Sequence, residues 1–520
     1  MAAAIPREQR AAAAFLAALA GAPPRETHIS AVFVGRGTAW KMKKAVRLPY
    51  LDFTTLAARR HFLGRELALN RRTAPEIYHD IVPIRRAANG ALGFGAEGEI
   101  VEWVLRMAAV PAADFFDRLA ASDALTPALA RALADRIAAF HSILPPVSGW
   151  DSPGAFGRLI AENEIAARAA GLPADELAAW ARAARTALAA RSAALAARAD
   201  AGFVRHAHGD LHLGNVCLWE GQPTLFDALE FDEALATIDL GYDIAFLLMD
   251  LDHRGRRDTA NLVFNRYVGR TGDVGMVAEL PLFLSLRALV RAHVEVARAK
   301  EADDRGEDGG VAAGLSYLAA ARSYLAPPGA GLVLAIGGLP GSGKSTLAQA
   351  LACGLGPAPG ALVLRSDEIR KRLHHVTPET RLPPEAYGQA ANEAVGEALL
   401  AAAATAAASR HVVILDASFL DPGLRAAAAA LALRLGVPFF GAWLDVPRAV
   451  LEARIAARRD DASDATLTVL RRILATTPPV PAISPKWHCI DGADTAAAAA
   501  AIRARLANAA SGAQDTGIRS

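Results

Sequence analysis

The sequence has little of what marks several protein classes. Its three cysteines, Cys217, Cys353 and Cys489, are scattered, odd in number and without CxxC spacing. Such a set argues against a disulfide framework or a zinc site and is typical of a reducing cytoplasm. No window of about 18 apolar residues lacks charge, so no membrane-spanning helix is expected.

A strong excess of charge is also missing. The formal net charge is +2, which leaves no electrostatic footprint for nucleic acid. The content of 53% hydrophobic and 21% charged residues is that of a globular protein. Because 520 residues are too many for one hydrophobic core, two or three domains are expected.

The spacing of apolar residues predicts how the chain is organised. We expect strands within 30–48 and 99–107, a helix over 54–72, helices over 112–200, a loop with two strands over 203–231 and helices over 239–325. After the Pro/Gly-rich stretch LAPPGAG, short apolar strands alternate with helices, which implies a parallel sheet flanked by helices. The predicted parts are domains at 1–325 and 331–507, a linker at 326–330 and a disordered tail at 508–520.

The stretch GLPGSGKST at 338–346 matches the phosphate-binding pattern G-x-x-x-x-G-K-S. Its glycines let backbone N–H groups turn toward the phosphates, its lysine reaches the terminal phosphates, and its serine hydroxyl holds Mg²⁺. A strand precedes it and a helix follows, so the positive helix N-terminus faces the anion. The predicted ATP-binding residues are Gly338, Gly341, Ser342, Gly343, Lys344, Ser345 and Thr346, with Ser345 also a magnesium ligand.

Two aspartates follow later strands of the same sheet. Asp367 comes directly after LVLRS and Asp416 ends VVILD, so both are expected at the carboxyl edge where ligands bind. A carboxylate there can accept the proton of an attacking hydroxyl or help to hold Mg²⁺. We predict that Asp367 is the catalytic base and Asp416 a metal residue. The alternative is that each caps the N-terminus of a helix.

The helix of LDVPRAVLEARIAARRD carries Arg454, Arg458 and Arg459. Arg454 and Arg458 are four residues apart and share a face. We predict that these two form a lid over the triphosphate, where they neutralise charge in the transition state. A solvated basic helix face is the alternative.

Residues 330–505 resemble the small P-loop kinases that phosphorylate metabolite or polynucleotide hydroxyls, such as gluconate kinases. The resemblance rests on GLPGSGKST, RSDEIR, LDASF and ARIAARR. It implies that Asp367 is the general base and that Arg370 contacts substrate or phosphate. It does not name the acceptor.

A second set of residues centres on HGDLHLGN at 208–215. Asp210 and Asn215 have the spacing of the kinase catalytic loop H-R-D-x-x-x-x-N, where the Asp takes the acceptor proton and the Asn binds Mg²⁺. Asp227, on the apolar strand TLFDALEF, supplies a further metal carboxylate, although the chain reads D-A-L where a kinase reads D-F-G. His208 is expected to make structural hydrogen bonds.

The nucleotide also needs a cation, and TAWK at 38–41 parallels the kinase motif V-A-I-K. We predict that Lys41 binds ATP and that Glu66, in the following helix, positions it. Lys43 shares the strand face of Lys41, whereas Lys44 points the other way. A solvated, protective edge strand is the alternative for this lysine-rich stretch. The nearby GRG lacks the third glycine of a kinase glycine loop.

Residues 1–325 resemble the aminoglycoside phosphotransferase-like, or protein-kinase-like, fold. The whole chain resembles the bacterial fusions known as bifunctional aminoglycoside phosphotransferase/ATP-binding proteins, through stretches such as AWKMKKAV, LDFTTLAARRHF, VEWVLRM and HGDLHLGN. The expected fold class is therefore mixed α/β and α+β, a kinase-like fold followed by a P-loop NTPase with a parallel sheet. The aminoglycoside label proves no substrate.

The acceptors are poorly specified by the sequence. An acidic series follows the catalytic loop: Glu230, Asp232, Glu233, Asp239, Asp243, Asp250 and Asp252. It could form a pocket for a polycationic aminoglycoside, but we favour helix caps and bracing of the site, with Asp239 and Asp243 supporting the catalytic loop.

The function predicted is a phosphotransferase with two ATP and Mg²⁺ sites that acts on small-molecule hydroxyls, with neither nucleic acid nor membrane as partner. Alternatively, a degenerate kinase-like half binds nucleotide and controls the P-loop half. Use of ATP places the protein in the cytoplasm. REQRAAAAFLAALAGAPP at 7–24 faintly resembles a signal peptide, and we interpret it as a short amphipathic helix. The sequence does not indicate the oligomeric state.

Overall fold

The computed structural model describes residues 5–48, 51–95, 97–303, 311–457, 462–476 and 487–515. Contacts within the chain divide it into two compact units. The first contains the described residues up to His253 together with Leu282–Leu325. The second contains Arg254–Pro281 together with the described residues from Ala326 onward.

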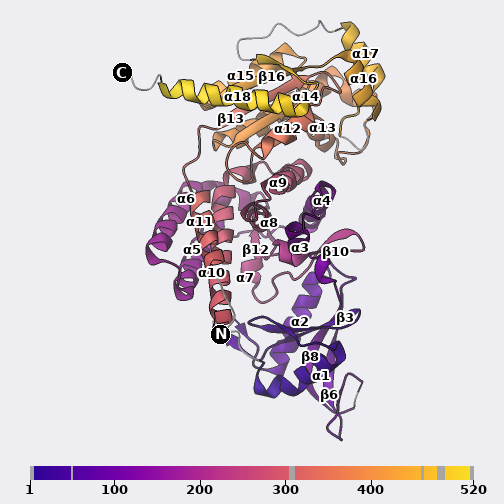
Figure 1. Ribbon diagram of the computed structural model, residues 1–520, viewed down its shortest axis with the longest axis vertical. Coiled ribbons are helices and arrows are strands. Elements are labelled where there is room, and N and C mark those ends of the chain that lie inside the picture. Colours follow the sequence, from indigo (N-terminus) through magenta and orange to yellow (C-terminus); the bar gives the residue numbers. More distant parts are fainter. Residues whose placement is uncertain are drawn as a thin grey trace. The chain divides into compact units, whose positions relative to one another are not determined.

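The first unit begins with an antiparallel sheet of six strands in the order β1-β2-β3-β8-β6-β7. Helices α1 and α2 pack against this sheet (Figure 1). The elements are α1 (Arg10–Ala20), β1 (Arg25–Glu26), β2 (Ser30–Val34), β3 (Thr38–Lys43), α2 (Leu56–Asn70), β6 (Tyr78–Arg86), β7 (Leu92–Gly93) and β8 (Glu99–Ala108), with a short pair of β4 (Arg47–Leu48) and β5 (Leu51–Asp52).

Alternation along β3 decides which side chains reach each helix. Met42 is buried in a cluster with Leu16 of α1. Its neighbours Lys41 and Lys43 point to the opposite face, as residues two apart on a strand do, and there they meet Glu66 of α2. The helix predicted within 7–24 is α1, and its Leu16 is buried in the core.

The rest of the first unit is mostly helical, with two small strand pairs. The elements are α3 (Phe116–Ala121), α4 (Pro127–Ile143), α5 (Ser152–Ala170), α6 (Ala174–Asp200), β9 (Val204–His206), β10 (Val216–Trp219), β11 (Gln222–Leu225), α7 (Glu233–Ala236), β12 (Thr237–Asp239), α8 (Leu240–His253), α10 (Leu280–Asp303) and α11 (Ala312–Tyr324). The indole of Trp180 on α6 donates to Ser285 on α10 at 2.9 Å, and Phe156 of α5 stacks on Phe283 of α10. These contacts tie the helices into one core.

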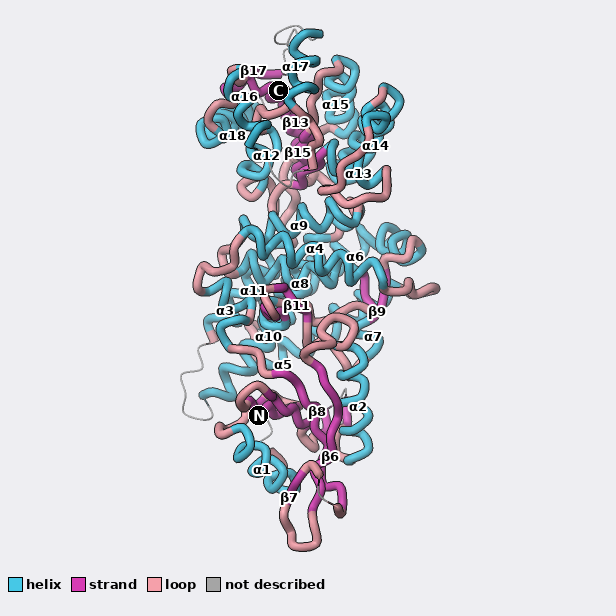
Figure 2. The backbone as a smooth tube through the Cα atoms, turned by 90° about the vertical axis from the view of Figure 1, so that its right-hand side faces the viewer, coloured by secondary structure: helices cyan, strands magenta, loops and turns pink. Residues whose placement is uncertain are grey.

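The second unit contains a parallel sheet of five strands in the order β14-β15-β13-β16-β17. Its elements are α9 (Arg257–Thr271), β13 (Leu332–Gly338), α12 (Lys344–Ala352), β14 (Leu362–Arg365), α13 (Ser366–Leu373), α14 (Gln389–Ala408), β15 (Val412–Asp416), α15 (Pro422–Leu435), β16 (Phe439–Asp445), α16 (Arg448–Ala457), α17 (Leu467–Thr476), β17 (Trp487–Asp491) and α18 (Thr495–Asp515). Figure 2 shows α12 and α18 on one side of the sheet and α13, α14 and α15 on the other.

The predicted fold class is confirmed by both sheets. One expectation at the C-terminus needs correction, because α18 continues to Asp515 and so includes 508–515 of the tail predicted to be disordered. Alanine, the strongest helix former, fills much of this helix. Within the described ranges, no helix combines the length and apolar character needed to cross a membrane.

Candidate functional site

In the first unit, one carboxylate of α2 binds two lysines of β3. Oε1 of Glu66 lies 2.7 Å from Nζ of Lys41, and Oε2 lies 2.7 Å from Nζ of Lys43. Lys41 also contacts Oδ1 of Asp227 at 2.7 Å, while Lys43 pairs with Glu230. The predicted Lys41–Glu66 pair is therefore present, and the structure adds Lys43 as a second cation on the same carboxylate.

This cluster keeps its lysines charged although it lies in the interior. Burial alone would lower the pKa of Lys41, but the carboxylates of Asp227 and Glu66 outweigh burial and raise it well above the usual value. Conversely, burial would raise the pKa of Asp227, and the Lys41 ammonium lowers it. Lys41 is 11% exposed and Asp227 39%, whereas Lys43 is fully buried. Only the Lys41–Asp227 edge of the cluster is open to a ligand.

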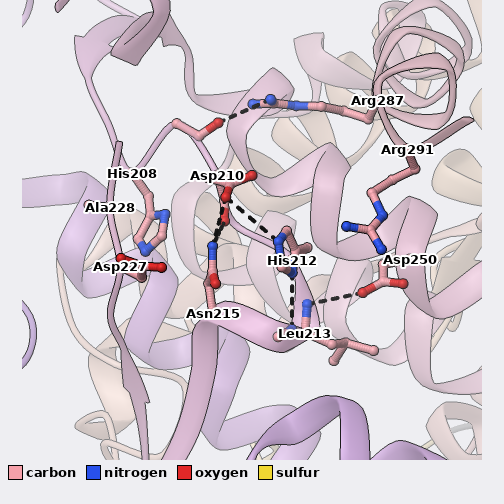
Figure 3. A network of polar contacts seen from close by, with 12 residues as sticks. His208, Asp210, His212, Leu213, Asn215, Asp227, Ala228, Asp250, Arg287 and Arg291 are labelled. Atoms are coloured by element: carbon pink, nitrogen blue, oxygen red, sulfur yellow. Dashed lines mark hydrogen bonds and ion pairs between the residues drawn. The ribbon is translucent and has the colours of Figure 1, made fainter. Parts of the chain in front are cut away.

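The catalytic loop brings Asp210 and Asn215 together. The Asn215 amide donates to Oδ2 of Asp210 at 2.8 Å and to its carbonyl at 2.9 Å. Figure 3 shows these two side chains next to one another, with Asp227 on the neighbouring segment. His212, for which the motif predicted no role, places Nε2 at 3.6 Å from Oδ2 of Asp210.

A β-hairpin explains why Asp227 reaches this loop. Val216 of β10 pairs with Leu225 of β11, and the Phe226 amide then donates to the carbonyl of Asn215 at 3.1 Å. Asn215 and Asp227 thus flank the open end of one hairpin.

The backbone of Asp227 is in the left-handed region with φ 59°, which is uncommon for a residue other than glycine. Its N–H donates to the Tyr78 hydroxyl of β6 at 3.1 Å, a contact that no sequence motif indicated. A non-glycine residue held in this region marks a constraint imposed by its surroundings.

A buried aspartate of α8 braces the catalytic loop from behind. Asp243 accepts the backbone N–H groups of His208 at 3.1 Å and Gly209 at 2.9 Å, and it contacts Nε2 of His141 at 3.1 Å. Burial would raise the pKa of Asp243, but the bond to His141 and the surrounding cations lower it to about 2. Arg287 of α10 donates to the carbonyl of Gly209 at 3.0 Å.

His208 itself is structural, as expected. One ring nitrogen, Nε2, lies 3.0 Å from the carbonyl of Phe226, and burial lowers the pKa of the imidazole. The side chain is fully buried, so it is closed to a substrate.

Members of the acidic series after the catalytic loop all have partners within the chain. These partners are Lys43 for Glu230, the α7 amides for Asp232, Arg65 for Glu233, Arg198 for Asp239, the catalytic loop for Asp243, the Leu213 amide for Asp250 and the Tyr324 hydroxyl for Asp252. Their geometry matches the interpretation as caps and braces.

In the second unit, the stretch 338–346 joins β13 to α12 and has the geometry of an anion-binding loop. Gly338, Gly341 and Gly343 have φ of 148°, 83° and 88°, which L side chains rarely adopt. A Cβ on Gly341 would lie 2.7 Å from the carbonyl of Leu451, so the loop also approaches α16 too closely for a side chain. The buried hydroxyl of Ser342 has no hydrogen-bond partner among the described residues.

The hydroxyl of Ser345 and the carboxylate of Asp416 meet at the carboxyl edge of the sheet. Ser345 Oγ donates to Asp416 Oδ2 at 2.6 Å. Arg365, at the end of β14, contacts the same carboxylate oxygen at 3.3 Å and donates to Ser345 Oγ at 3.2 Å. Lys344 donates to the carbonyl of Leu339 at 3.0 Å. Thr346 is exposed on the first turn of α12.

Asp367 faces this group from the first turn of α13. Its pKa is raised by burial and by the charge of Asp416, while Arg365 and Lys344 pull in the opposite direction. A hydrogen bond with Ser463 also favours its ionised form. The charges of Asp416 and Lys344 thus act on the Asp367 carboxyl. Asp416 does not cap a helix in the structure, since its carboxylate binds Ser345 and Arg365.

A polar cavity of about 730 Å³ lies beside Ser463 in the same unit. Arg381, Thr466 and Thr468 also line it. A cavity of this size accommodates a small metabolite.

Two of the arginines predicted to contact nucleotide or substrate near the P-loop bind other groups of the chain. Arg370 donates to the Ala386 carbonyl at 2.6 Å and to Asn392 at 2.8 Å, so it supports the chain after α13 and its side chain is buried. Arg454 donates to the carbonyls of Ser342 and Gly492 at 3.1 Å, and to that of Ala493 at 2.6 Å. Arg454 therefore buttresses the P-loop backbone from α16.

Two further arginines, Arg458 and Arg459, lie outside the described residues, so the predicted lid pair is seen only in part.

Both sites suit a magnesium-bound polyphosphate. Magnesium is usually held by one or two carboxylates together with substrate phosphates. Each site offers one carboxylate and one further side-chain oxygen: Asp227 and Asn215 in the first unit, and Asp416 and Ser345 in the second. Among the described residues, no group of three or more His, Cys, Asp or Glu side chains forms a self-sufficient metal site. The orphaned Ser342 hydroxyl and the glycine cradle fit a phosphate at the second site.

Comparison with known proteins gives two family matches. The model of the phosphotransferase enzyme family matches residues 63–275, and that of an AAA domain matches residues 333–480. Similar solved structures include a gluconokinase from Sinorhizobium meliloti, with 23% identity over 36% of this chain and 97% of its own and a TM-score of 0.26. A choline/ethanolamine kinase family protein from Mesorhizobium loti has 14% identity over 61% of this chain and 95% of its own, with a TM-score of 0.37.

Relatives along nearly the whole chain are also found. Uncharacterized proteins of Mycobacterium tuberculosis and Mycobacterium bovis are 30% identical over 472 residues, which is 87% of this chain and 89% of theirs. The chain therefore belongs to the family of these mycobacterial proteins, and it joins a phosphotransferase-family region to an AAA domain of the P-loop type.

Proposed function

We propose that this protein is an ATP-dependent phosphotransferase with two nucleotide sites, each of which transfers the γ-phosphate to a hydroxyl of a small molecule. One observation carries the proposal. Each unit separately gathers a lysine, an acceptor-side aspartate and a pair of oxygen ligands: Lys41, Asp210, Asn215 and Asp227 in the first, and Lys344, Asp367, Ser345 and Asp416 in the second.

In the P-loop site, the residues divide the work of transfer. The backbone of 338–343 and Lys344 hold the phosphates, and Ser345 and Asp416 are the ligands for Mg²⁺. When bound, Mg²⁺ neutralises the charge of the phosphates as transfer proceeds. Asp367 takes the proton of the acceptor hydroxyl, and its raised pKa suits a base that must bind a proton. The cavity beside Ser463 is the proposed acceptor pocket.

In the kinase-like site, Lys41 binds the phosphates and Glu66 fixes its position. Asp210 takes the acceptor proton, and the amide of Asn215 orients its carboxylate at 2.8 Å. Asn215 and Asp227 are the proposed magnesium ligands. The Asp243 brace fixes the loop backbone, so Asp210 is presented from a rigid support.

The test is transfer of labelled γ-phosphate to a panel of metabolites and aminoglycosides by the full chain. Lys344→Ala is expected to abolish transfer at the P-loop site while ATP still binds to the kinase-like site. Asp210→Asn is expected to abolish transfer at the kinase-like site with little loss of ATP affinity. If Lys344→Ala removed all ATP binding, the claim of two sites would be wrong.

The same variants address a second function, in which the kinase-like unit binds nucleotide only to control the P-loop unit. The sequence D-A-L at 227–229 favours that alternative, because it departs from the kinase pattern. In that case Asp210→Asn would leave every transfer reaction of the panel unchanged.

A further inference from the structure

The helix α9 is assigned to one region by its family match and to another by its packing. It lies within residues 63–275, which match the phosphotransferase enzyme family. Nevertheless, Arg254–Pro281 packs as part of the second compact unit, with the parallel sheet and the P-loop. The P-loop unit thus contains a segment from outside its own family match, and the contacts of α9 indicate what that segment does.

Asn265 of α9 takes the place of a missing strand at the edge of the sheet. β14 is the outermost strand on its side, and an edge strand presents unpaired backbone groups from alternate residues. The Val363 N–H donates to Oδ1 of Asn265 at 2.7 Å, and Nδ2 of Asn265 donates to the Ala361 carbonyl at 3.1 Å. One side-chain amide therefore pairs with both groups, as the backbone of a neighbouring strand would.

A second amide strengthens this cap. Nδ2 of Asn261, one helical turn earlier, also donates to the Ala361 carbonyl at 3.1 Å. Asn261, Ala361 and Val363 are all buried, so water cannot replace these bonds without opening the interface. A Cβ on Gly360 would lie 2.7 Å from Nδ2 of Asn261, which shows how closely the helix approaches the chain entering β14.

Further along α9, Gly269 has no side chain, and this lets Glu368 of α13 lie close to the backbone of the helix. A Cβ on Gly269 would lie 2.6 Å from Oε2 of Glu368, and the Gly269 carbonyl accepts a bond from Arg372 at 2.9 Å. Burial raises the pKa of Glu368, and the charges of Arg365 and of Arg266, also on α9, act in the opposite direction. Arg266 also binds Glu379 at 2.6 Å. The Glu368 carboxylate is thus fixed on its α9 side.

Glu368 in turn holds the arginine that contacts both proposed magnesium ligands. Oε1 of Glu368 lies 3.1 Å from Nη1 of Arg365. Arg365 contacts Asp416 at 3.3 Å and Ser345 at 3.2 Å through its other nitrogens. Arg365 is the last residue of β14, two positions after Val363. The side-chain amides of Asn261 and Asn265 hold the strand that carries Arg365, and Glu368 holds its guanidinium.

We propose that α9 is a positioning element of the P-loop site, acting through Asn265 on β14 and through Glu368 on Arg365. Support of this kind around a metal site is worth about 10–100-fold in metal affinity or activity. The proposal rests on the proposed function, because it assigns Ser345 and Asp416 as ligands for Mg²⁺.

The test uses the full chain and measures binding of a fluorescent ATP analogue over a range of Mg²⁺ concentrations. The component lost in Lys344→Ala defines the P-loop site. Asn265→Leu removes the amide cap, and it is expected to raise the Mg²⁺ concentration needed for half-maximal binding of that component by about tenfold. Amide hydrogen exchange of 361–365 is expected to accelerate in the same variant. Asp258→Ala, at an exposed position of α9, should change neither quantity.

Glu368→Gln keeps the size of the side chain but removes the charge that holds Arg365. It is expected to shift the Mg²⁺ requirement in the same direction, and it serves as the test if Asn265→Leu does not fold. An unchanged Mg²⁺ requirement in a folded Asn265→Leu or in Glu368→Gln would overturn the positioning role. A Lys344→Ala protein that binds as the unmodified chain does would instead contradict the proposed function.

Discussion

The ammonium of Lys43 lies 2.7 Å from Oε2 of Glu66, on the carboxylate whose other oxygen holds Lys41. The two lysines differ in what else they touch. Lys41 reaches Asp227 at the open edge of the site, whereas Lys43 is fully buried against Glu230. We infer that Lys41 serves the nucleotide and that Lys43 keeps α2 attached to the sheet.

Replacement of each lysine by methionine separates these roles. Lys43→Met leaves Glu230 buried without its partner, and breaking a buried pair from one side costs about 3–5 kcal/mol in the free energy of unfolding. Lys41→Met is expected to cost less stability, because Glu66 retains Lys43 and Asp227 is partly exposed, but to abolish nucleotide binding at the kinase-like site. Urea denaturation and nucleotide titration of both variants measure the two effects.

The double variant Lys43→Met/Glu230→Met is the control. Replacing both members of a buried pair by apolar residues is often neutral, so most of the lost stability should return. Equal losses of stability in Lys41→Met and Lys43→Met would contradict the division of roles.

The catalytic-loop brace at Asp243 predicts a pH dependence of stability. Its folded pKa of about 2 is below the usual 3.8, so the carboxylate stabilises the fold at pH values above 3.8. This contribution, about 2 kcal/mol, is lost as the pH falls from about 4 through 2. Unfolding free energies of the unmodified chain and of Asp243→Asn should therefore differ at neutral pH and converge toward pH 2.

A matched carboxylate provides the comparison for this prediction. The carboxylate of Asp232 caps the short helix α7 by accepting hydrogen bonds from two backbone amides, and it lies nearer the surface than Asp243 does. Asp232→Asn retains a good capping group, so its effect should stay within about 0.5 kcal/mol. A difference between Asp243→Asn and the unmodified chain that persisted unchanged at pH 2 would exclude ionisation of Asp243 as its source.

The sequence predicted those parts of the sites that depend on local spacing. Alternation along a strand puts Lys41 and Lys43 on one face, and parallel strands put Asp367 and Asp416 at one edge. The glycines of the P-loop are required by the positive φ of its backbone, so the motif and the geometry agree.

Residues that meet only in the folded chain carried no such signal. Tyr78, which binds the amide of Asp227, is separated from it by 149 positions, and Asn265 is 98 positions from Val363. A tyrosine on a strand or an asparagine on a helix is unremarkable until its partner is known. For Arg454, a basic pair on a helix predicted a lid, and the structure adds contacts that the pattern did not indicate: its guanidinium binds the carbonyl of Ser342 in the P-loop and that of Gly492 after β17.

The electrostatics of Asp367 predict a pH profile for transfer at the P-loop site. Burial and the charge of Asp416 raise its pKa above the usual 3.8, so the acidic limb of kcat/KM is expected above that value. The hydrogen bond from Ser463 lowers the pKa by stabilising the ionised carboxylate. Ser463→Ala removes that bond, so the pKa rises and the acidic limb moves to higher pH. Thr468→Ala, in the same cavity, should leave the limb in place.

The same raised pKa means that ionisation of Asp367 lowers the free energy of unfolding. A carboxyl whose pKa is higher in the folded than in the unfolded state favours folding below the unfolded pKa, and this advantage disappears as the pH rises through the folded pKa. Asp367→Asn should therefore abolish transfer and at the same time raise the free energy of unfolding at neutral pH. An enzyme that retains such a group is less stable than it could be, because activity requires the base. A variant that lost both activity and stability would indicate that Asp367 serves the fold rather than the reaction.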